Sequence, residues 1–435
     1  MAKDDVGAMP ERMRVLLVGN GGREHALAEA IAKSPRCEKL WAANPGNPGI
    51  DALAEPVNVP ANTREIYRLR QFCDANRVDF VVIGPEDPLA DGWADELARS
   101  DKGVRRIVFG PTKKAAQIEA DKAFSKQLMR GASIPTAEGR VFQDPERAKA
   151  FLESRDELYV VKAAGLAKGK GVIVPETPEE ALRAVDDMMT RRVFGEAGRT
   201  IVIEEKLSGV EASVLALTDG KSVLVLPPCQ DHKRLRDGDK GPNTGGMGAF
   251  CPTSSLDGAT MATVEREILV PMLDALRREE IDFRGVLYAG LMLTHAGPRV
   301  LEFNARFGDP ECQPLLARLE SDLLELLWLT AAGRLDEADV RFRDEAAVTV
   351  VMASENYPEK PKTGDEITGL EEASRLEGVR VHLAGATERG GAIVTSGGRV
   401  LGVTGLGKTM AEARDRAYAG VDRIRFRGMQ VRRDI

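Results

Sequence analysis

The sequence predicts a multidomain protein that combines an α/β unit with α+β units. Strand and helix signals alternate over roughly the first hundred residues, which indicates βαβ units around a parallel sheet. Beyond about residue 116 the strands instead follow one another in pairs joined by short turns, as in antiparallel sheets. The chain has 435 residues, which is too long for one ordinary core and suggests about two to four domains.

The composition is that of an ordinary globular protein, with 43% apolar residues, 30% charged residues and a net charge of −7. It gives no reason to expect nucleic acid or a membrane as the main partner. The five cysteines contain no CxxC pair, and the four histidines lack metal-ligand spacing. We therefore expect neither disulfides nor a zinc site, and a reducing location, the cytoplasm. Oligomeric state leaves no mark on the sequence, and a monomer is the simplest expectation.

Three domains follow from the pattern. Residues 1–12 are charged and lack an apolar stretch, so we expect a disordered extension and not a signal peptide. The first domain is assigned to residues 13–115. Its strands are expected at residues 14–18, 40–43, 80–83 and 106–109, with a helix after the first strand that ends near Ser34.

The second domain is assigned to residues 116–330, with a lid at about residues 137–203. A helix capped by Thr112 is expected to run to Arg130. Strand pairs are expected at residues 158–162 with 171–174, 200–205 with 211–217 (continued by 221–226), and 286–293 with 299–306. The third domain, residues 331–435, is expected to be a mixed α/β unit. Its strands are expected at residues 347–353, 379–383, 391–395 and 400–404, before a helix from about Met410.

The strand at residues 300–306, VLEFNAR, carries the most informative chemistry. Side chains alternate across a strand, so Leu301, Phe303 and Ala305 are expected to face the core. Glu302, Asn304 and Arg306 then share the other face. A carboxylate and an amide two residues apart suit a hard cation that bridges phosphate oxygens. Taken alone, the pattern favours a half-buried strand with a solvated polar face over a metal site.

A basic glycine-rich loop follows the strand at 158–162. It combines Lys162, Lys168 and Lys170 with Gly165, Gly169 and Gly171. Glycine lets backbone N–H groups approach phosphate oxygens, and lysine neutralises their charge. Strands on both sides predict a hairpin flap over phosphates, the alternative being a mobile basic hairpin.

Two further segments suggest substrate contacts. The strand ending in Glu204 and Glu205 leads into a hinge where an edge backbone and Leu207 suit an adenine ring, and Glu211 suits ribose hydroxyls. Surface glutamates are the equally good alternative there. Residues 230–234 (QDHKR) and 241–248 (GPNTGGMG) predict a close-fitting substrate loop, with a flexible linker as the alternative.

The sequence GNGG at residues 19–22 lies between a strand and a helix N-terminus, which is a ready anion site. It departs from a dinucleotide fingerprint because Glu24 stands where the last glycine is needed. A monophosphate therefore fits better than NAD. A decoy occurs at residues 402–409, which match GxxxxGK[ST]. The strands before it read as antiparallel, so we interpret Lys408 as a loop lysine before a capped helix.

Together these segments resemble the glycinamide ribonucleotide synthetase (phosphoribosylamine–glycine ligase) family of the ATP-grasp superfamily. The resemblance spans residues 15–435. It rests on VLLVGNGGREHALA, NPGNPG, VVIGPEDPLADG, VVKAAGLAKGKGVIV, IVIEEKLSGVEAS, QDHKR, GPNTGGMGAF, LYAGLML and LEFNARFGDPE. It implies a biotin-carboxylase-like first domain and an ATP-grasp domain with a hinged lid. It also implies ligation of glycine to 5-phosphoribosylamine with ATP, through glycyl phosphate, in purine biosynthesis.

The resemblance also assigns residues. It implies ATP contacts from Lys122, Lys162, Gly169, Gly171, Glu204, Glu205, Leu207 and Glu211, and Mg²⁺ or Mn²⁺ ligands at Glu302 and Asn304. It implies substrate contacts from Gly19, Asn20, Gly21, Gly22, Arg23, Glu24, Glu86, Asp87, Asp231 and Lys233, and catalytic roles for Arg306, Lys162 and Asp309. One departure is that the strand at residues 289–293 lacks the second acidic metal ligand of many ATP-grasp enzymes.

Three alternatives remain open at this point. The chain could be another ATP-grasp ligase or carboxylase that acts on a different purine intermediate. It could be a nucleotide-sensing regulator with an inactive ATP site. The evidence against this alternative is the presence of Lys162, Glu302 and Asn304, which an active site requires. It could also be a P-loop kinase that uses Lys408.

Overall fold

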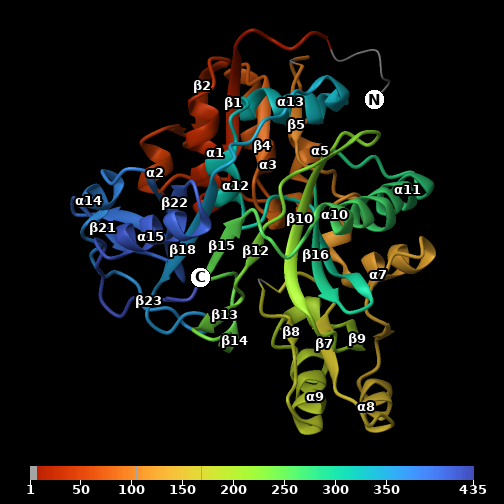
Figure 1. The fold of residues 1–435 in the computed structure, drawn as a ribbon. Coiled ribbons are helices and arrows are strands. Elements are labelled where there is room, and N and C mark those ends of the chain that lie inside the picture. The colour runs from red at the N-terminus through yellow and green to blue at the C-terminus, as the bar shows by residue number, and fades with distance from the viewer. Residues whose placement is uncertain (1–6, 104, 168) are drawn as a thin grey trace.

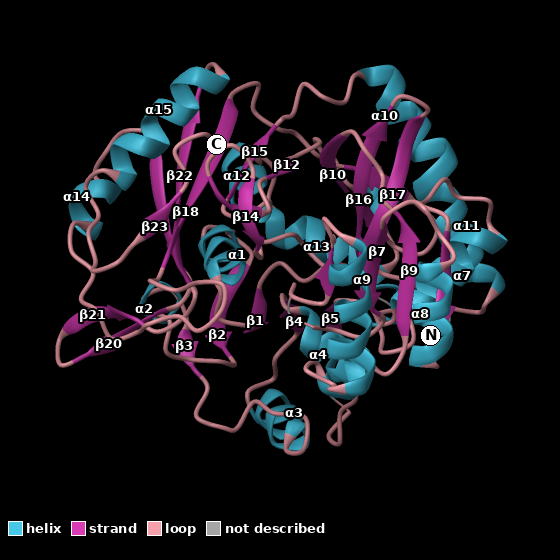
Figure 2. Ribbon diagram, turned by 90° about the horizontal axis from the view of Figure 1, so that it is seen from below, coloured by secondary structure: helices cyan, strands magenta, loops and turns pink. Residues whose placement is uncertain are grey.

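The computed structural model describes residues 7–103, 105–167 and 169–435. The molecule consists of three domains and a projecting lid (Figure 1). Residues of all of these parts line one cavity. Viewed from below, the C-terminal sheet and the central antiparallel sheet stand on opposite sides of the molecule (Figure 2). The multidomain α/β and α+β fold expected from the sequence is confirmed.

The first domain is built on a five-stranded parallel sheet of order β3-β2-β1-β4-β5. Its strands are β1 (Met13–Val18), β2 (Cys37–Ala42), β3 (Glu55–Pro56), β4 (Phe80–Ile83) and β5 (Ile107–Phe109). Val15 and Leu17 of β1 face one core and Leu16 and Val18 the other. Both faces are therefore covered, as an all-parallel sheet requires.

The helices of this region divide between the two faces. α1 (Gly22–Ala32) packs on one face, and α3 (Ile66–Ala75) and α5 (Trp93–Leu97) pack on the other. α13 (Leu323–Ala332) joins the α1 face although it begins almost three hundred residues after α1 ends. The short helices α2 (Pro48–Asp51) and α4 (Glu86–Asp91) follow β2 and β4.

The central sheet is antiparallel, with the order β11-β10-β16-β17. Its strands are β10 (Val210–Thr218), β11 (Val223–Val225), β16 (Gly285–Thr294) and β17 (Gly297–Asn304), and the last two form the expected hairpin. Helices α7 (Lys122–Gly131), α10 (Gly258–Val264) and α11 (Val270–Arg278) share its core.

The lid is a separate four-stranded sheet of order β6-β9-β7-β8. Its strands are β6 (Gly139–Phe142), β7 (Tyr159–Ala163), β8 (Val172–Ile173) and β9 (Ile201–Glu205). α8 (Pro145–Glu153) and α9 (Pro178–Val185) pack on it, and the whole unit projects at the bottom of Figure 1. β7 and β8 pair antiparallel, which confirms the expected hairpin around the glycine-rich loop. Lys168 of that loop lies outside the described residues.

The C-terminal sheet has the order β12-β15-β18-β22-β19, with β23 paired to β18. Its strands are β12 (Gln230–Asp231), β15 (Gly248–Cys251), β18 (Ala346–Ala353), β19 (Val379–Leu383), β22 (Arg399–Gly407) and β23 (Gln430–Val431). α12 (Cys312–Arg318), α14 (Leu370–Ser374) and α15 (Met410–Val421) pack around it. Two small hairpins, β13 (Arg234–Arg236) with β14 (Lys240–Asn243) and β20 (Ala386–Arg389) with β21 (Ala392–Thr395), complete the fold.

Several local expectations were wrong. β9 and β10 do not pair: β9 lies between β6 and β7 in the lid, and β10 pairs with β16. The chain changes sheets at Gly209, whose φ of +158° and closeness to the Leu293 carbonyl leave no room for a side chain. Figure 1 shows β9 in the lid and β10 in the body of the molecule.

The helix expected from Thr112 to Arg130 is interrupted. Asp121 is extended, with φ −135° and ψ 100°, between α6 (Gln117–Ala120) and α7. Its carboxylate accepts the backbone N–H groups of Ala123 and Phe124 at 2.9 and 3.1 Å, so it caps a new helix. This break places Lys122 on the first turn of α7.

Two expectations about the edges of the domains also changed. Residues 230–231 and 248–251, assigned by sequence to the second domain, pair into the C-terminal sheet. Residues 1–6 of the expected disordered extension lie outside the described residues. The following residues are in contact with the fold, because Met9 packs against the first core and Arg36 donates to the Pro10 carbonyl.

Candidate active site

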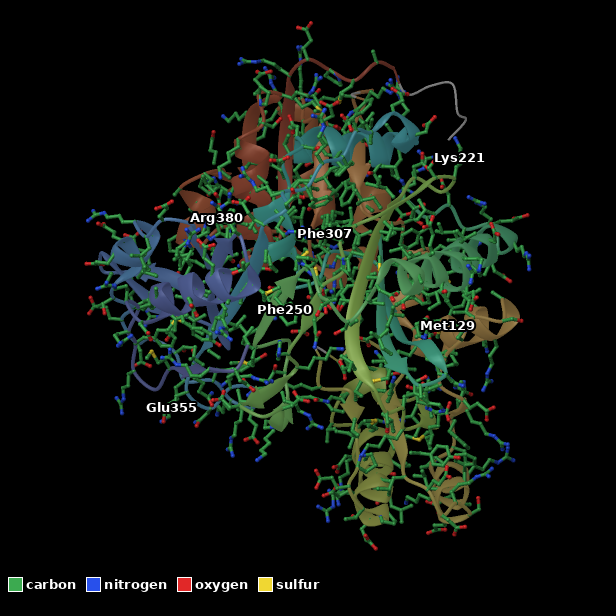
Figure 3. All side chains as sticks on the ribbon, viewed as in Figure 1. Met129, Lys221, Phe250, Phe307, Glu355 and Arg380 are labelled. Atoms are coloured by element: carbon green, nitrogen blue, oxygen red, sulfur yellow. The ribbon has the colours of Figure 1, made fainter. Side chains whose placement is uncertain are left out.

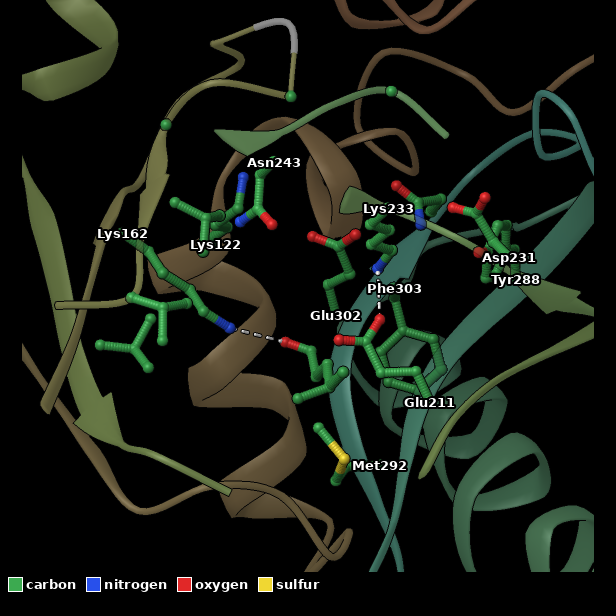
Figure 4. Close-up of a pocket in the computed structure, with 18 of the residues that line it drawn as sticks. Lys122, Lys162, Glu211, Asp231, Lys233, Asn243, Tyr288, Met292, Glu302 and Phe303 are labelled. Carbon is green, nitrogen blue, oxygen red and sulfur yellow. Dashed lines mark hydrogen bonds and ion pairs between the residues drawn. The ribbon is translucent and has the colours of Figure 1, made fainter. Parts of the chain in front are cut away.

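A cavity of about 940 Å³ lies where the lid, the central sheet, the first domain and the C-terminal sheet meet. Figure 4 shows side chains from several of these elements pointing into it. The predicted site residues that line it are Glu86, Asp87, Lys122, Lys162, Gly169, Gly171, Glu204, Glu205, Leu207, Glu211, Asp231, Lys233, Glu302, Asn304, Arg306 and Asp309. Residues as far apart in sequence as Glu86 and Asp309 are thus brought into one site.

β17 presents Glu302 and Asn304 to the cavity, as the alternation predicted. The expectation for Leu301 was wrong. The register between β16 and β17 shifts at this point, so Leu301 is bulged out of the core and Val300 takes its place beside Phe303. A bulge leaves backbone groups unpaired, and the Leu301 carbonyl accepts a hydrogen bond from Nζ of Lys162 at 3.2 Å.

Positive charges surround Glu302. Burial acts to raise the pKa of this carboxyl, but the charges of Lys233 and Lys122 outweigh it and lower the pKa to about 2. Glu302 is therefore ionised at neutral pH. Figure 4 shows its carboxylate between Lys122 on one side and Lys233 on the other.

The carboxylate of Glu204 is buried between two lysines. It pairs with Lys162 and, at 2.7 Å, with Lys126. Burial acts to raise its pKa, but these two charges lower it. The backbone of Glu204 is paired to strands on both sides, Gly139 in β6 and Val160 in β7. The structure thus places this side chain on a lysine partner and not at the open hinge edge.

The hinge itself follows β9. Glu205 accepts a hydrogen bond from the Glu138 backbone at 2.9 Å and pairs with Arg299 at 3.1 Å. Glu211, at the start of β10, pairs with Lys233 at 3.3 Å, which is the contact drawn in Figure 4. Burial acts to lower the pKa of Lys233, but the charges of Glu211 and Glu302 outweigh burial and raise the pKa.

An alternating cluster of acids and arginines closes the far end of the cavity. Arg306 pairs with Glu119 at 2.9 Å and with Glu86 at 3.2 Å, and Glu86 lies 3.8 Å from Arg23. Burial acts to raise the pKa of Glu86, but the two arginines lower it to about 2. The same acids raise the pKa of Arg306 against the effect of burial. This cluster links β17 to the carboxyl ends of the first sheet.

The loop between β1 and α1 lies behind that cluster. Gly19, Gly21, Gly22, Arg23 and Glu24 do not line the main cavity, and Asn20 lines a neighbouring one of about 490 Å³. The Glu24 side chain is buried and accepts from the Gly21 N–H at 2.8 Å and from Arg23 at 2.6 Å. This carboxylate therefore shapes the loop from within. Arg23 in turn donates to the Phe307 carbonyl at 2.9 Å.

Phe307, labelled near the centre of Figure 3, is a contact between the site and the first domain. Its ring stacks on Phe109 at the end of β5, with the centroids 6.2 Å apart. The turn that carries Asp309 is thus held against the parallel sheet. Asp309 keeps a lowered pKa, because Arg399 and Arg23 together outweigh the effect of burial.

Several site residues were missed by sequence reasoning. Glu311 is buried and accepts hydrogen bonds from Ser213, at 3.0 Å, and from Tyr288. Arg399, at the start of β22, reaches Asp309 from the C-terminal domain. Glu311 belongs to the FGDPE motif and was within reach of the prediction. Arg399 and Ser213 lie in unremarkable strands and carry no local signal.

Glu302 and Asn304 are the candidate metal ligands of β17. No group of three or more His, Cys, Asp or Glu able to hold a metal occurs within residues 7–103, 105–167 and 169–435. One carboxylate and one amide oxygen, surrounded by lysines, leave most positions of a cation to water and phosphate oxygens. That is the preference of Mg²⁺ and similar hard cations when they bind with a nucleotide, so the residues fit such an ion.

The Walker-like sequence does not form a phosphate loop. Residues 402–407 lie within β22, which is paired antiparallel to both β18 and β19. Lys408 is exposed, and Thr409 caps α15 by accepting the Glu412 N–H at 3.2 Å. The interpretation of Lys408 as a loop lysine is confirmed. The described residues also contain no helix with the length and apolar character needed to cross a bilayer.

The antiparallel central sheet, the hinged lid and the lysine-lined cavity between them define the ATP-grasp class of enzymes. Residues 13–119, 120–312 and 347–435 match the N domain, the ATP-grasp (A) domain and the C domain of phosphoribosylglycinamide synthetase. The chain belongs to the phosphoribosylglycinamide synthetase family.

Individual relatives agree with this assignment. A phosphoribosylamine–glycine ligase of Rhodopirellula baltica is 48% identical over 98% of this chain and 97% of its own. The trifunctional purine biosynthetic protein adenosine-3 of Homo sapiens is 46% identical over 97% of this chain and 41% of that longer protein. The crystal structure of phosphoribosylamine–glycine ligase from Thermotoga maritima superposes with a TM-score of 0.82 at 33% identity, covering 97% of this chain and 100% of that one.

The fold extends to enzymes of other activity. The biotin carboxylase domain of a 2-oxoglutarate carboxylase from Hydrogenobacter thermophilus superposes with a TM-score of 0.72 at 18% identity, covering 97% of this chain and 92% of that one. At that identity the likeness concerns the fold alone. It matches the biotin-carboxylase-like architecture expected from the sequence.

Proposed function

We propose that the protein ligates glycine to 5-phosphoribosylamine with ATP, giving glycinamide ribonucleotide, ADP and phosphate in de novo purine biosynthesis. The observation that carries the proposal is that Lys122, Lys162, Glu302 and Asn304 line one cavity. The cavity continues past Arg306 towards the first domain. It thus offers a phosphate region next to a region rich in paired acids and arginines.

The reaction consists of two transfers. A carboxylate oxygen of glycine attacks the γ-phosphorus of ATP, ADP leaves, and glycyl phosphate forms. The amine of phosphoribosylamine then attacks the acyl carbon, phosphate leaves, and the new amide nitrogen loses a proton. Fixed positive charge near the transferred group stabilises both transition states because it is already in place when negative charge develops.

We assign the nucleotide to the lid side of the cavity. Lys122 and Lys162 neutralise the phosphates, Gly169 and Gly171 let the flap backbone approach them, and Glu211 receives the ribose. Adenine lies at the hinge formed by Glu205 and Leu207. Glu204 holds Lys162 in position through their ion pair.

A divalent cation, Mg²⁺ or Mn²⁺, fits Glu302 and Asn304, which would hold it, and it would supply positive charge that offsets the charge of the phosphates. The chain supplies the remaining functions. Arg306 and Asp309 position the glycine and the transferred phosphoryl group. The lid, at about residues 137–203, excludes water from the acyl phosphate when it closes.

We assign phosphoribosylamine to the first domain. The N-terminal end of α1, with Gly19, Asn20, Gly21, Gly22 and Arg23, suits its phosphate group. Glu86 and Asp87 face the main cavity from the carboxyl end of β4. The charge cluster of Arg23, Glu86 and Arg306 then joins the two substrate regions.

A coupled assay of ADP release tests the proposal, with each substrate omitted in turn. We expect ADP only when ATP, a divalent cation, glycine and phosphoribosylamine are all present, and glycinamide ribonucleotide as the product. ADP release with another carboxylate but not with glycine would overturn the assignment. Tight ATP binding without turnover under complete conditions would indicate a nucleotide sensor instead.

A further inference from the structure

Two cysteines face each other behind the wall of the cavity. Cys229 comes directly before β12, and Cys251 ends β15. The antiparallel ladder between these strands pairs Gln230 with Phe250, so one step further sets Cys229 opposite Cys251. Cα atoms of directly opposed residues in such a ladder lie about 4.5 or 5.5 Å apart. Both values fall within the roughly 4.4–6.8 Å that a disulfide spans.

The two sulfur atoms lie close together. Each thiol donates to the same backbone carbonyl, that of Pro227, at 3.7 Å from Cys229 and 3.9 Å from Cys251. Both side chains are fully buried, and all five cysteines of the chain are free thiols. The pair is therefore reduced in this structure, but it is positioned for a disulfide.

Arg318, the last residue of α12, adds a positive charge to this pair. Its Nη1 lies 3.1 Å from Sγ of Cys251, and its other nitrogens donate to the backbone carbonyls of Glu345, at 2.5 Å, and Arg343, at 2.9 Å. The guanidinium is buried, and no carboxylate of the described residues forms an ion pair with it. Buried charges in proteins are paired, so the sulfur of Cys251 is the anion available to Arg318.

The two thiols therefore differ in reactivity. The contact between them lowers the pKa of Cys251 and raises that of Cys229, and Arg318 lowers the pKa of Cys251 further against the effect of burial. The thiolate is the form of cysteine that attacks an oxidant. Cys251 is thus the nucleophile of the pair, and Cys229 is the neighbouring thiol that can condense with its oxidised form.

We propose that Cys229 and Cys251 form a reversible disulfide when a hydroperoxide reaches Cys251, and that this disulfide lowers the activity of the enzyme. The thiolate sulfur of Cys251 attacks one oxygen of hydrogen peroxide, an S–O bond forms, the O–O bond breaks, and hydroxide leaves. The sulfur of Cys229 then attacks the resulting sulfenic acid. The S–S bond forms, the S–O bond breaks, and the hydroxyl group leaves as water with the proton of Cys229. The two sulfurs together lose two electrons, which the peroxide gains.

The pair is linked to the substrate cavity through β10. The backbone N–H and carbonyl of Cys229 pair with those of Ser213 at 2.9 and 2.8 Å, and the Ser213 hydroxyl donates to Glu311 at 3.0 Å. Glu311 lines the cavity, and its charge acts on Cys229. The cavity therefore approaches the pair at this point, which gives a small oxidant its route.

The same connection predicts the effect of oxidation. Glu311 stands directly before α12, and Arg318 ends that helix. A disulfide would remove the anionic partner of Arg318 and leave a buried charge unpaired, which is strongly destabilising. Oxidation should therefore displace α12 and, with it, Glu311 in the wall of the cavity.

The test treats the full chain with hydrogen peroxide, blocks the remaining thiols with N-ethylmaleimide under denaturing conditions, and maps the peptides by mass spectrometry without reductant. We expect a peptide pair linked through Cys229 and Cys251. ADP release should fall by about 10- to 100-fold, as for a displacement of about 1 Å at a catalytic site, and dithiothreitol should restore it. The peptide map needs no substrate. In a parent protein without ADP release, a linked peptide would still support the disulfide, and only the proposed function would fail.

Variants of single cysteines separate the roles. Cys229→Ala should stop at the sulfenic acid of Cys251, which dimedone labels. Cys251→Ser keeps an acceptor for Arg318 and should give neither the label nor the disulfide. The matched control is Cys37→Ser, because Cys37 is the least buried of the five cysteines. It should form the Cys229–Cys251 disulfide as the parent does.

Three other outcomes would overturn the inference. Oxidation of Cys37 without a linked peptide would mean that exposure, and not the neighbouring Arg318, selects the reactive thiol. A disulfide that leaves a measurable ADP release unchanged would contradict the control of activity. Sulfinic acid at Cys251 in place of the disulfide would contradict reversibility.

Discussion

Arg399 lies with Nη2 3.0 Å from Oδ2 of Asp309, although 90 residues separate the two in the chain. Its Nη1 donates to the backbone carbonyls of Gly245, at 2.6 Å, and of Asp309. One guanidinium from β22 thereby ties the turn after β17 to the loop at residues 241–248. The C-terminal domain thus helps to build the cavity.

Arg399→Lys should lower kcat/KM by about 10- to 100-fold, because an ammonium cannot satisfy the Asp309 carboxylate and two carbonyls with the same planar fork. The measurement is steady-state ADP release at varied glycine and phosphoribosylamine. The matched control is Arg389→Lys, the same change at an exposed position of β20, and it should leave kcat/KM unchanged. Full activity in Arg399→Lys would show that the turn keeps its position without this contact.

Lys162→Met should reduce kcat by about 10³-fold, because it removes a fixed charge from the transferred phosphoryl group. Glu204 keeps its partner Lys126 at 2.7 Å, so the loss of stability should stay below the roughly 3–5 kcal/mol expected for a fully unpaired buried charge. Lys408→Ala, at the end of the Walker-like sequence, should retain nearly full activity. The opposite pattern of activities would contradict the placement of ATP. Urea unfolding of both variants checks the fold.

Glu302→Gln should raise the metal concentration for half-maximal activity by about 100-fold, since ligand loss costs at least as much as loss of an outer contact. The pKa of about 2 keeps Glu302 ionised throughout the assay range. The difference in metal requirement between the parent and the variant should therefore be the same at every pH in that range. A titration of Mg²⁺ and Mn²⁺ at saturating ATP gives the measurement. Glu388→Gln, at an exposed position of β20, is the control and should give the same metal titration as the parent. An unchanged titration in Glu302→Gln would place the metal elsewhere.

His25 should make the folded protein sensitive to acid. Its Nδ1 accepts the Leu383 N–H at 2.8 Å, which requires that nitrogen to be unprotonated. Burial and the neighbouring His382 lower its pKa from 6.5 to about 3. The unfolded chain therefore binds more protons between these values, so this contribution to stability is complete above about pH 6.5 and is lost as the pH falls towards 3.

The test is the free energy of unfolding in urea from pH 4 to 7. His25→Asn keeps an acceptor for Leu383 and removes the titration. Its slope should be shallower than that of the parent by up to about 1.4 kcal/mol per pH unit, the value of one proton. Equal slopes would mean that His25 titrates alike in the folded and unfolded chains.

The elements predicted well are those with a strong local period. β1, β4 and the β16–β17 hairpin have continuous apolar or alternating patterns, and short turns leave them few possible partners. Glu302 and Asn304 could be placed on one face because a strand alternates whatever lies beside it. Lys162 could be placed at the end of an apolar strand for the same reason.

The errors about strands share a cause, which is the register or choice of partner between strands. Leu301 leaves the core because the register of β16 against β17 shifts there. β9 and β10 separate because each finds a better partner elsewhere, and β12 and β15 pair into a sheet formed mostly by residues after 345. Neither the register shift nor the choice of pairing partner produces a periodic pattern in the sequence of the strand concerned.

The amino-acid order alone was enough to specify most of the longer strands, the glycine-rich flap, the shared face of Glu302 and Asn304, and the likeness to one enzyme family, because each depends on neighbours a few residues away. Only the tertiary structure decided that Glu204 pairs with Lys162, that Arg399 reaches Asp309, and that Oδ1 of Asp231 is buried without a hydrogen-bond partner among the described residues. Such relationships depend on burial and on the distance between charges from different domains, and both quantities exist only once the chain has folded.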